Sequence, residues 1–140
     1  MKVRDIMTEN VEIVTPETSL EDVAKIMTEN DIGCVPVCQN QTVLGMITDR
    51  DIIIRVIAKG KNPATTRAKD IMSTEIKTVS PDTDAHAAAN IMSESQIKRL
   101  PVVENGKLTG ILALGDLAIE DIHIDEAGNA LSGISQGIQH

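Results

Sequence analysis

The chain has 140 residues and a formal net charge of −8, and 41% of its residues are hydrophobic although none is Phe, Tyr or Trp. A chain of this length buries about 70% of its unfolded surface, so it can form a core, which must consist of aliphatic and methionine side chains. Because the negative charge repels phosphate backbones and no aromatic ring is present to stack on a base, we expect no nucleic acid among its partners.

The first elements in chain order are a short strand and a helix. Weak alternation of apolar residues predicts a strand over residues 11–15, which Pro16 ends. Thr18 and Glu21 have the Thr-x-x-Glu form of a helix capping box, so we expect the helix to begin there. The residues predicted to form its buried stripe are Leu20, Val23, Ala24 and Met27.

Two more strands and a second helix follow in the first half of the chain. The apolar segments around residues 35–37 and over residues 43–48 predict strands, joined by a turn at residues 39–41. A second helix is predicted from Asp49 to about Lys59. The order of elements is therefore β-α-β-β-α.

The two cysteines, Cys34 and Cys38, both lie in or beside the segment predicted as the second strand. Four residues of extended strand separate their backbones by about 13 Å. A disulfide requires Cα atoms within about 7 Å of each other. We therefore expect two buried thiols rather than a disulfide, a redox pair or a metal site.

The second half of the chain repeats the first. A shift of 65 positions aligns Val3–Val56 with Ala68–Asp121 without a gap, and 17 of the 54 pairs are identical. D-I-M opens both copies, VTPET returns as VSPDT, and GMITDRD returns as GILALGD. The second copy has its predicted helical stripe at Ala85, Ala88, Ala89 and Met92, and a tight hairpin at Asn105–Gly106.

This duplication predicts an α/β (α+β) fold made of two β-α-β-β-α repeats. One repeat alone leaves apolar surface uncovered, so we expect the two to pack about an approximate twofold axis. The polar segment KGKNPATTRA predicts the linker between them. The predicted boundaries are residues 1–59 and 68–122 for the repeats, 60–67 for the linker, and 123–140 for a C-terminal extension.

No segment of the sequence approaches the roughly 20 apolar residues of a membrane span. Residues 1–12 also lack the apolar run of a signal peptide. We therefore expect a cytoplasmic protein without a membrane partner.

The two copies resemble a tandem pair of CBS domains, also called a Bateman module, of the kind found in small stand-alone bacterial proteins. The resemblance covers residues 1–122 and rests on D-I-M, Thr/Ser-Pro, the hydrophobic-Pro-Val strand and the final Gly-x-x-x-x-x-Asp motif. It implies a regulatory module with no catalytic cofactor. Such pairs bind AMP, ADP, ATP or S-adenosylmethionine in clefts between the copies, and they commonly form homodimers.

The resemblance also assigns a site. In the family motif Gly-hydrophobic-x-Thr/Ser-x-x-Asp, the acid accepts hydrogen bonds from the ribose hydroxyls. Thr48 and Asp51 complete this motif, whereas Asp116 follows an alanine, Ala113, at the hydroxyl position. Losing one neutral hydrogen bond costs about 0.5–1.5 kcal/mol, or about two- to tenfold in affinity. We therefore expect two pockets, with the one at Asp116 weaker or differently selective.

Further site residues are implied by position within the family pattern. Lys98 and Arg99 precede the central strand of the second copy, where a basic side chain faces the ligand phosphates in relatives, and Arg50 lies inside the first motif. The adenine base is expected against Thr15, Leu20 and Ile32 in one pocket and against Ser80, Ala85 and Ile97 in the other.

Alternative interpretations of these residues remain open. Thr48 and Asp51 also form a helix capping box that needs no ligand, and Lys98 and Arg99 can simply be solvated. The chain would then be a structural dimerisation scaffold with vestigial sites. If the module is a sensor, its signal must pass to an unidentified effector protein, because the sequence contains no attached catalytic domain.

An enzyme is the third possibility. None of His86, His123 and His140 has a neighbouring nucleophile motif or metal-ligand spacing. Asp121 and Asp125 share a helical face that His123 does not, so this segment does not predict a metal site. We therefore expect a protein that is not an enzyme and has no metal.

Overall fold

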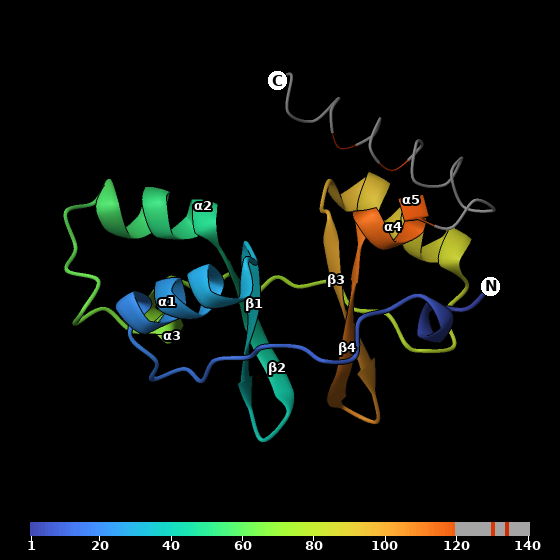
Figure 1. Ribbon diagram of the computed structural model, residues 1–140, viewed down its shortest axis with the longest axis horizontal. Helices are drawn as coiled ribbons and strands as arrows, with labels where there is room; N and C mark the ends of the chain where they lie inside the picture. Colours follow the sequence, from blue (N-terminus) through green and yellow to red (C-terminus); the bar gives the residue numbers. More distant parts are fainter. Residues whose placement is uncertain (120–129, 131–133, 135–140) are drawn as a thin grey trace. The chain divides into compact units, whose positions relative to one another are not determined.

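The computed structural model describes residues 1–119, Ala130 and Ile134, and in it the chain forms two compact units (Figure 1). The first-repeat unit is Glu12–Ile76. The second-repeat unit combines Met1–Val11 with the chain from Lys77 onward. Except for the buried Ala130 and Ile134, the predicted extension over 123–140 lies outside the described residues, as do His123 and His140.

Each unit contains a helix, a two-stranded antiparallel sheet and a second helix, which confirms the predicted mixed fold. The first-repeat unit consists of α1 (Leu20–Asn30), β1 (Cys34–Gln39), β2 (Thr42–Thr48), α2 (Asp49–Ile52), the π-helical stretch η2 (Ile53–Ile57) and α3 (Ala68–Ile71). The second-repeat unit consists of the 3-10 turn η1 (Val3–Asp5), α4 (Ala85–Ser95), β3 (Arg99–Glu104), β4 (Lys107–Ala113) and α5 (Leu114–Ile119).

The hairpins match the sequence prediction closely. Both central residues of the second hairpin turn have positive φ, 53° at Asn105 and 77° at Gly106, as a tight hairpin of this type requires. In the first hairpin Asn40 and Gln41 take the same conformation without a glycine. Both sheets have a register irregularity after the hydrophobic-Pro-Val segment, at Val37 and at Val102.

The predicted strand over residues 11–15 is wrong in extent. Only Val14 pairs, in a parallel bridge to Val37, and Val79 forms the same bridge to Val102 in the other unit. Ile13 is 42% exposed and Pro16 begins a turn, so the segment touches the sheet at a single buried residue.

The predicted cap of the first helix is also displaced by one residue. Ser19 is the N-cap, and its hydroxyl accepts the N–H of Asp22 at 3.2 Å. The Thr18 hydroxyl is used earlier, because it accepts the N–H of Thr15 at 3.1 Å and closes the turn at Pro16. The second unit has the same turn, with the Ser80 N–H donating to the Thr83 hydroxyl at 3.0 Å.

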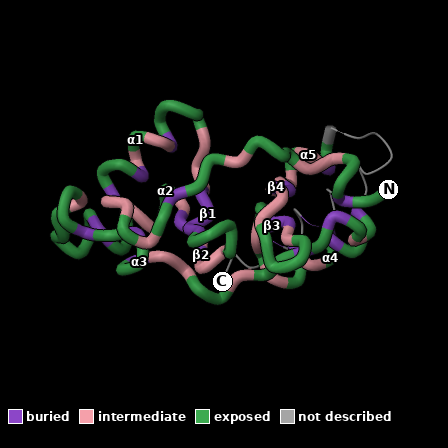
Figure 2. The backbone as a smooth tube through the Cα atoms, turned by 90° about the horizontal axis from the view of Figure 1, so that it is seen from below, coloured by how far each residue is buried: buried purple, intermediate pink, exposed green. Residues whose placement is uncertain are grey.

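Each unit has its own apolar core, which Figure 2 shows as buried segments along β1 and β3. All four residues of the stripe predicted for the second copy are buried, and three of the four in the first copy are, Ala24 being half-buried. Cys38 is buried and Cys34 is half-buried, and neither is in a disulfide. Burial raises the pKa of the Cys38 thiol.

The opening D-I-M segment of each copy packs in the unit built by the other copy. Thr8 pairs with Ile111 of β4, and Ser73 pairs with Met46 of β2. Val3, which is fully buried, belongs to the core of the second-repeat unit, and Ile71 belongs to that of the first. Each compact unit therefore contains the opening D-I-M segment of the other sequence repeat.

The aspartate of D-I-M, which both copies share, has a local structural role. The Asp5 carboxylate accepts the N–H of Lys2 at 3.1 Å, and the Asp70 carboxylate accepts the N–H of Arg67 at 2.9 Å. In each case the acid closes the short helical turn that carries the buried apolar residue. This caps one of the backbone donors that a helix start leaves without an intrahelical partner.

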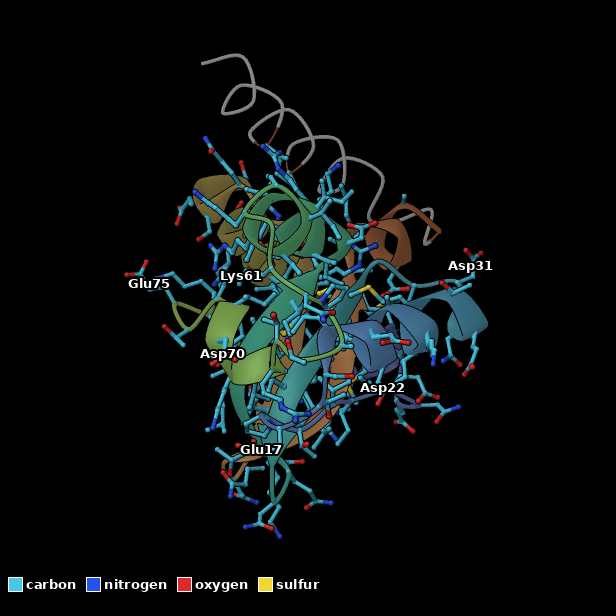
Figure 3. The ribbon with its side chains drawn as sticks, turned by 90° about the vertical axis from the view of Figure 1, so that its left-hand side faces the viewer. Glu17, Asp22, Asp31, Lys61, Asp70 and Glu75 are labelled. Atoms are coloured by element: carbon cyan, nitrogen blue, oxygen red, sulfur yellow. The ribbon has the colours of Figure 1, made fainter. Side chains whose placement is uncertain are left out.

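The segment predicted as a linker also contributes to the first-repeat unit. The backbone carbonyls of Thr66 and Pro63 accept the N–H groups of Leu20 and Glu21, at 3.0 and 3.1 Å. Thr66 is buried, at 8% exposed. Figure 3 looks onto this unit, and its labelled acids Glu17, Asp22, Asp31 and Asp70 are all exposed, consistent with the acidic net charge.

Candidate functional site

The candidate site of the first-repeat unit lies where β2 ends and α2 begins. The Thr48 N–H donates to Asp51 Oδ2 at 2.9 Å, and the Asp51 N–H donates to Thr48 Oγ1 at 3.1 Å. The two residues thus form the capping box that the sequence allowed as an alternative to a ligand site. The Asp51 side chain is 19% exposed, so its carboxylate is held close to the surface rather than sealed in the core.

The second carboxylate oxygen of Asp51 faces an arginine one turn further along the helix. Asp51 Oδ1 lies 3.8 Å from Arg55 Nε. Arg55 Nη1 in turn donates to the backbone carbonyl of Ile71 at 2.9 Å. Arg55 therefore spans from the acid of the motif to the end of α3.

The capping box does not exhaust the hydrogen-bonding capacity of Asp51. An ionised carboxylate has about four lone-pair positions. The Thr48 N–H occupies one of them, and the Arg55 guanidinium lies beside the other oxygen without a hydrogen-bond distance. Capacity remains for two hydroxyl donors, so the cap and a ribose contact are compatible at the same residue.

The second-repeat unit retains the acid but has lost half of this arrangement. The Ala113 N–H donates to Asp116 Oδ2 at 2.8 Å, which is the counterpart of the Thr48–Asp51 bond. Ala113 has no hydroxyl to accept a bond in return. Burial raises the pKa of the Asp116 carboxyl above its ordinary 3.8, and the bond from Ala113 offsets part of the rise.

This raised pKa predicts that Asp116 destabilises the unliganded fold at neutral pH. As the pH rises above 3.8, the unfolded chain loses the Asp116 proton before the folded chain does, so stability falls until the folded pKa is passed. We expect Asp116→Asn, which keeps an acceptor for Ala113, to be more stable than the wild type at pH 7. The advantage shrinks as the pH approaches 3.8, and urea unfolding at several pH values measures it. A wild type that is the more stable protein at pH 7 would contradict the prediction.

The start of the central strand lies beside the motif in each unit. The Asp49 N–H donates to the Gly33 carbonyl at 3.0 Å, and the Leu114 N–H donates to the Lys98 carbonyl at 2.8 Å. The structure therefore brings the backbone of Lys98 next to the helix that carries Asp116. Lys98 and Arg99 are exposed, and so is Arg50 in the first unit.

The residues expected to contact the adenine base differ in their accessibility. Thr15 and Ser80 are exposed in their turns, and Ile32 and Ile97 are half-buried. Leu20 and Ala85 are fully buried in the two cores. These last two side chains are not accessible from solvent, and the roles of all six residues remain predictions.

Two features of the site region escaped sequence reasoning. Arg55 carries the i, i+4 spacing from Asp51 that signals a helical ion pair, and this spacing was available in the sequence. The motif glycines Gly45 and Gly110 have a packing role. A Cβ on Gly45 would lie 2.8 Å from the carbonyl oxygen of Ser73, and one on Gly110 would lie 2.8 Å from that of Thr8. The close approach of the other copy's opening segment therefore explains why these two positions are glycine.

Within residues 1–119, Ala130 and Ile134, no group of three or more His, Cys, Asp or Glu side chains is placed to hold a metal ion. The segment with Asp121, His123 and Asp125 lies outside these residues. No helix in the described part of the chain is long and apolar enough to cross a membrane.

Comparison with known proteins places these observations in a family context. The family model described as CBS domain matches residues 3–58 and 68–123. The chain is 38% identical over 133 residues to the CBS domain-containing protein YhcV of Bacillus subtilis, covering 95% of this chain and 94% of YhcV.

Two solved structures show the fold and bear on ligands. One is Hypoxic Response Protein I with two coordinated zinc ions, at 35% identity and a TM-score of 0.80, covering 86% of this chain and 98% of that one. The other is CBSX2 in complex with AMP, at 29% identity and a TM-score of 0.76, covering 89% and 98% of the two chains.

Proposed function

Because this chain belongs to the CBS-domain family and carries two such domains in tandem, we propose that it is a sensor of an adenosine-containing ligand. The ligand class comprises AMP, ADP, ATP and S-adenosylmethionine. Proteins of this family are generally regulatory rather than catalytic, so the chain acts by binding and not by turnover. An assay of adenine-nucleotide hydrolysis tests this, because turnover abolished by Asp51→Ala would overturn it.

The observation that carries the proposal is the partly buried but still accessible carboxylate of Asp51, which is 19% exposed and retains unused hydrogen-bond acceptor positions. Charge-assisted hydrogen bonds from two ribose hydroxyls contribute about 1.5–3 kcal/mol each. The complex of the related CBSX2 with AMP supports the ligand class. Lys98 and Arg99, beside the Asp116 motif, supply the positive charge for ligand phosphates in the second-repeat unit.

A thermal-shift screen distinguishes the sensor from the alternative, a structural dimerisation scaffold with vestigial sites. A ligand at 100 times its dissociation constant stabilises the fold by about 2.7 kcal/mol. The panel is AMP, ADP, ATP, S-adenosylmethionine and NAD. Inorganic phosphate and ribose 5-phosphate serve as controls for the phosphate and sugar portions of a nucleotide. A melting temperature unchanged by every adenosine compound favours the scaffold.

The two sites are expected to differ in affinity because only one has the hydroxyl. We expect Ala113→Thr to strengthen the weaker site by about two- to tenfold, the contribution of one added hydrogen bond. The matched control is Ala113→Val, which has the same shape without the hydroxyl. Calorimetric titration with AMP measures both variants, and equal affinities would contradict the prediction.

The signal is a conformational change that a separate effector protein reads. Small-angle scattering with and without the ligand identified in the screen tests the change, and superimposable profiles would count against it. The effector itself has to be found among proteins whose binding to this chain depends on the ligand.

We expect a second copy of this chain to bind at the surface formed by α1, α2 and η2. A groove of about 420 Å³ lies on the first-repeat unit, and Ile57, which lines it, is 58% exposed. Charges of both signs rim the groove, so it can pair with itself across a twofold axis. The residues that line it are Leu20, Glu21, Ala24, Lys25, Thr28, Glu29, Ile52, Ile57 and Pro63.

We expect Ile57→Asp to weaken this homodimer at least tenfold, because the change places a charge in an apolar contact. Sedimentation velocity over a range of concentrations measures the effect. Ile13→Asp is the control, since Ile13 is 42% exposed and does not line the groove. Equal dissociation of the two variants would exclude the groove as the interface.

A further inference from the structure

Arg55 differs from an ordinary surface arginine because its guanidinium lies beside two groups of its own unit. Its Nη1 donates to the Ile71 carbonyl at 2.9 Å, and its Nε lies 3.8 Å from Asp51 Oδ1. Ile71 is 3% exposed and ends α3, so its carbonyl is a rigid anchor. A planar guanidinium presents five N–H donors in a fixed fork and can face both groups in one orientation, whereas a lysine offers one compact ammonium on a flexible stem.

The other oxygen of the Asp51 carboxylate is held by a backbone group of the same motif. The Thr48 N–H holds Asp51 Oδ2 at 2.9 Å. With Arg55 beside Oδ1, each oxygen has a neighbouring donor group, which favours one orientation of the carboxylate before any ligand arrives. An acceptor that is already oriented loses less conformational freedom on binding.

The second copy does not repeat this arginine. The aligned position is Glu120, an acid rather than a base. In the described part of the chain, the Asp116 carboxylate accepts the Ala113 N–H at 2.8 Å. The two copies therefore differ at the ligand acid in two ways, and the missing threonine hydroxyl is only one of them.

We propose that Arg55 is a positioning residue for the ligand acid Asp51, which it orients from the anchor at Ile71. The inference rests on the proposed function, since it assigns Arg55 to the adenosine site. Arg55 acts through Asp51 and does not contact the ligand. Loss of Arg55 therefore weakens binding only while Asp51 is present to be oriented.

A double-mutant cycle with AMP as the probe tests this. The proteins are the wild type, Arg55→Ala, Asp51→Asn and the double variant, with dissociation constants from NMR titration, which also reads weak binding. We expect Arg55→Ala to weaken AMP binding at the Asp51 site by about three- to tenfold and to add nothing further in the Asp51→Asn background. Losses that multiply would show that Arg55 acts independently of Asp51 and would overturn the proposal.

Two further variants separate orientation from charge and from folding. Arg55→Lys keeps the charge and is expected to recover only part of the lost affinity, and full recovery would overturn the role of the two-ended contact. Lys61→Ala, an exposed lysine of the same unit labelled in Figure 3, removes one positive charge elsewhere and should leave AMP binding unchanged. If Arg55→Ala binds AMP as tightly as the wild type, the positioning role of Arg55 is refuted but the proposed function is not. If the wild type does not bind AMP, the AMP-binding function on which this inference depends is refuted.

Discussion

Replacing Asp51 by alanine is expected to remove AMP binding at the first-repeat unit, with a loss of at least about a hundredfold in affinity. Two charge-assisted hydrogen bonds of about 1.5–3 kcal/mol each depend on this carboxylate, and each 1.4 kcal/mol corresponds to a tenfold change. Calorimetric titration of the wild type and the variant measures the loss as the disappearance of the tighter binding phase. The phase that belongs to the Asp116 site should persist.

The fold must be separated from the ligand contact in this experiment, because Asp51 also caps α2. Losing a cap costs about 1 kcal/mol of stability. Asp51→Asn keeps an oxygen that can accept the Thr48 N–H and removes only the charge, so it should be nearly as stable as the wild type and still bind AMP weakly. Asp49→Ala is the matched control: Asp49 is exposed at the first helical position, and its loss should leave affinity within about twofold. Wild-type affinity in Asp51→Ala would refute the assignment of the site.

Substituting Gly110 by alanine is expected to destabilise the second-repeat unit by about 1–3 kcal/mol, the usual cost of overpacking. The added Cβ would lie 2.8 Å from the Thr8 carbonyl oxygen and 2.9 Å from the sulfur of Met7. A methionine side chain can move away, but the Thr8 carbonyl accepts the Ile111 N–H at 2.9 Å, and that backbone pairing must yield. Urea unfolding measures the free energy, and hydrogen exchange should show faster exchange at Thr8 and Ile111.

A second glycine in the same motif provides the control. Nothing lies within 4 Å of a Cβ placed on Gly115, and this residue belongs to α5. Gly115→Ala is therefore expected to be neutral or to stabilise the helix by up to about 1 kcal/mol. If both variants lose stability equally, the close approach of the opening segment at Gly110 is not the cause.

The features that were predictable from the sequence are those that depend on local pattern. The repeat, the two hairpins and the stripe at Ala85, Ala88, Ala89 and Met92 follow from spacing within a few residues, and the structure has them. The tight hairpin predicted at Asn105–Gly106 has the positive φ values that such a turn requires. The capping pair of Thr48 and Asp51 was recognised for the same reason.

The features that were not predictable depend on contacts between segments distant in sequence, or on which of two possible hydrogen bonds a hydroxyl group makes. Thr18 does not cap α1, because its hydroxyl already closes the turn after Thr15 and leaves Ser19 to cap the helix. The bond from Arg55 to Ile71 joins residues 16 positions apart across two elements, which no local period reveals. The assignment of the base-contacting residues is still a prediction, and Leu20 and Ala85 show that position in a family pattern does not guarantee an accessible side chain.

The placement of the two D-I-M segments has a consequence for how such a chain can have arisen. A half-length ancestor with one D-I-M segment and one hairpin would contain every element of a unit, yet that D-I-M segment would have to dock on a twin molecule, as Thr8 docks on Ile111. Such an ancestor would be an obligate dimer whose subunits exchange their D-I-M segments. Joining the two halves in one chain makes this exchange intramolecular and allows each half to vary separately, as Arg55 and Glu120 differ at one aligned position.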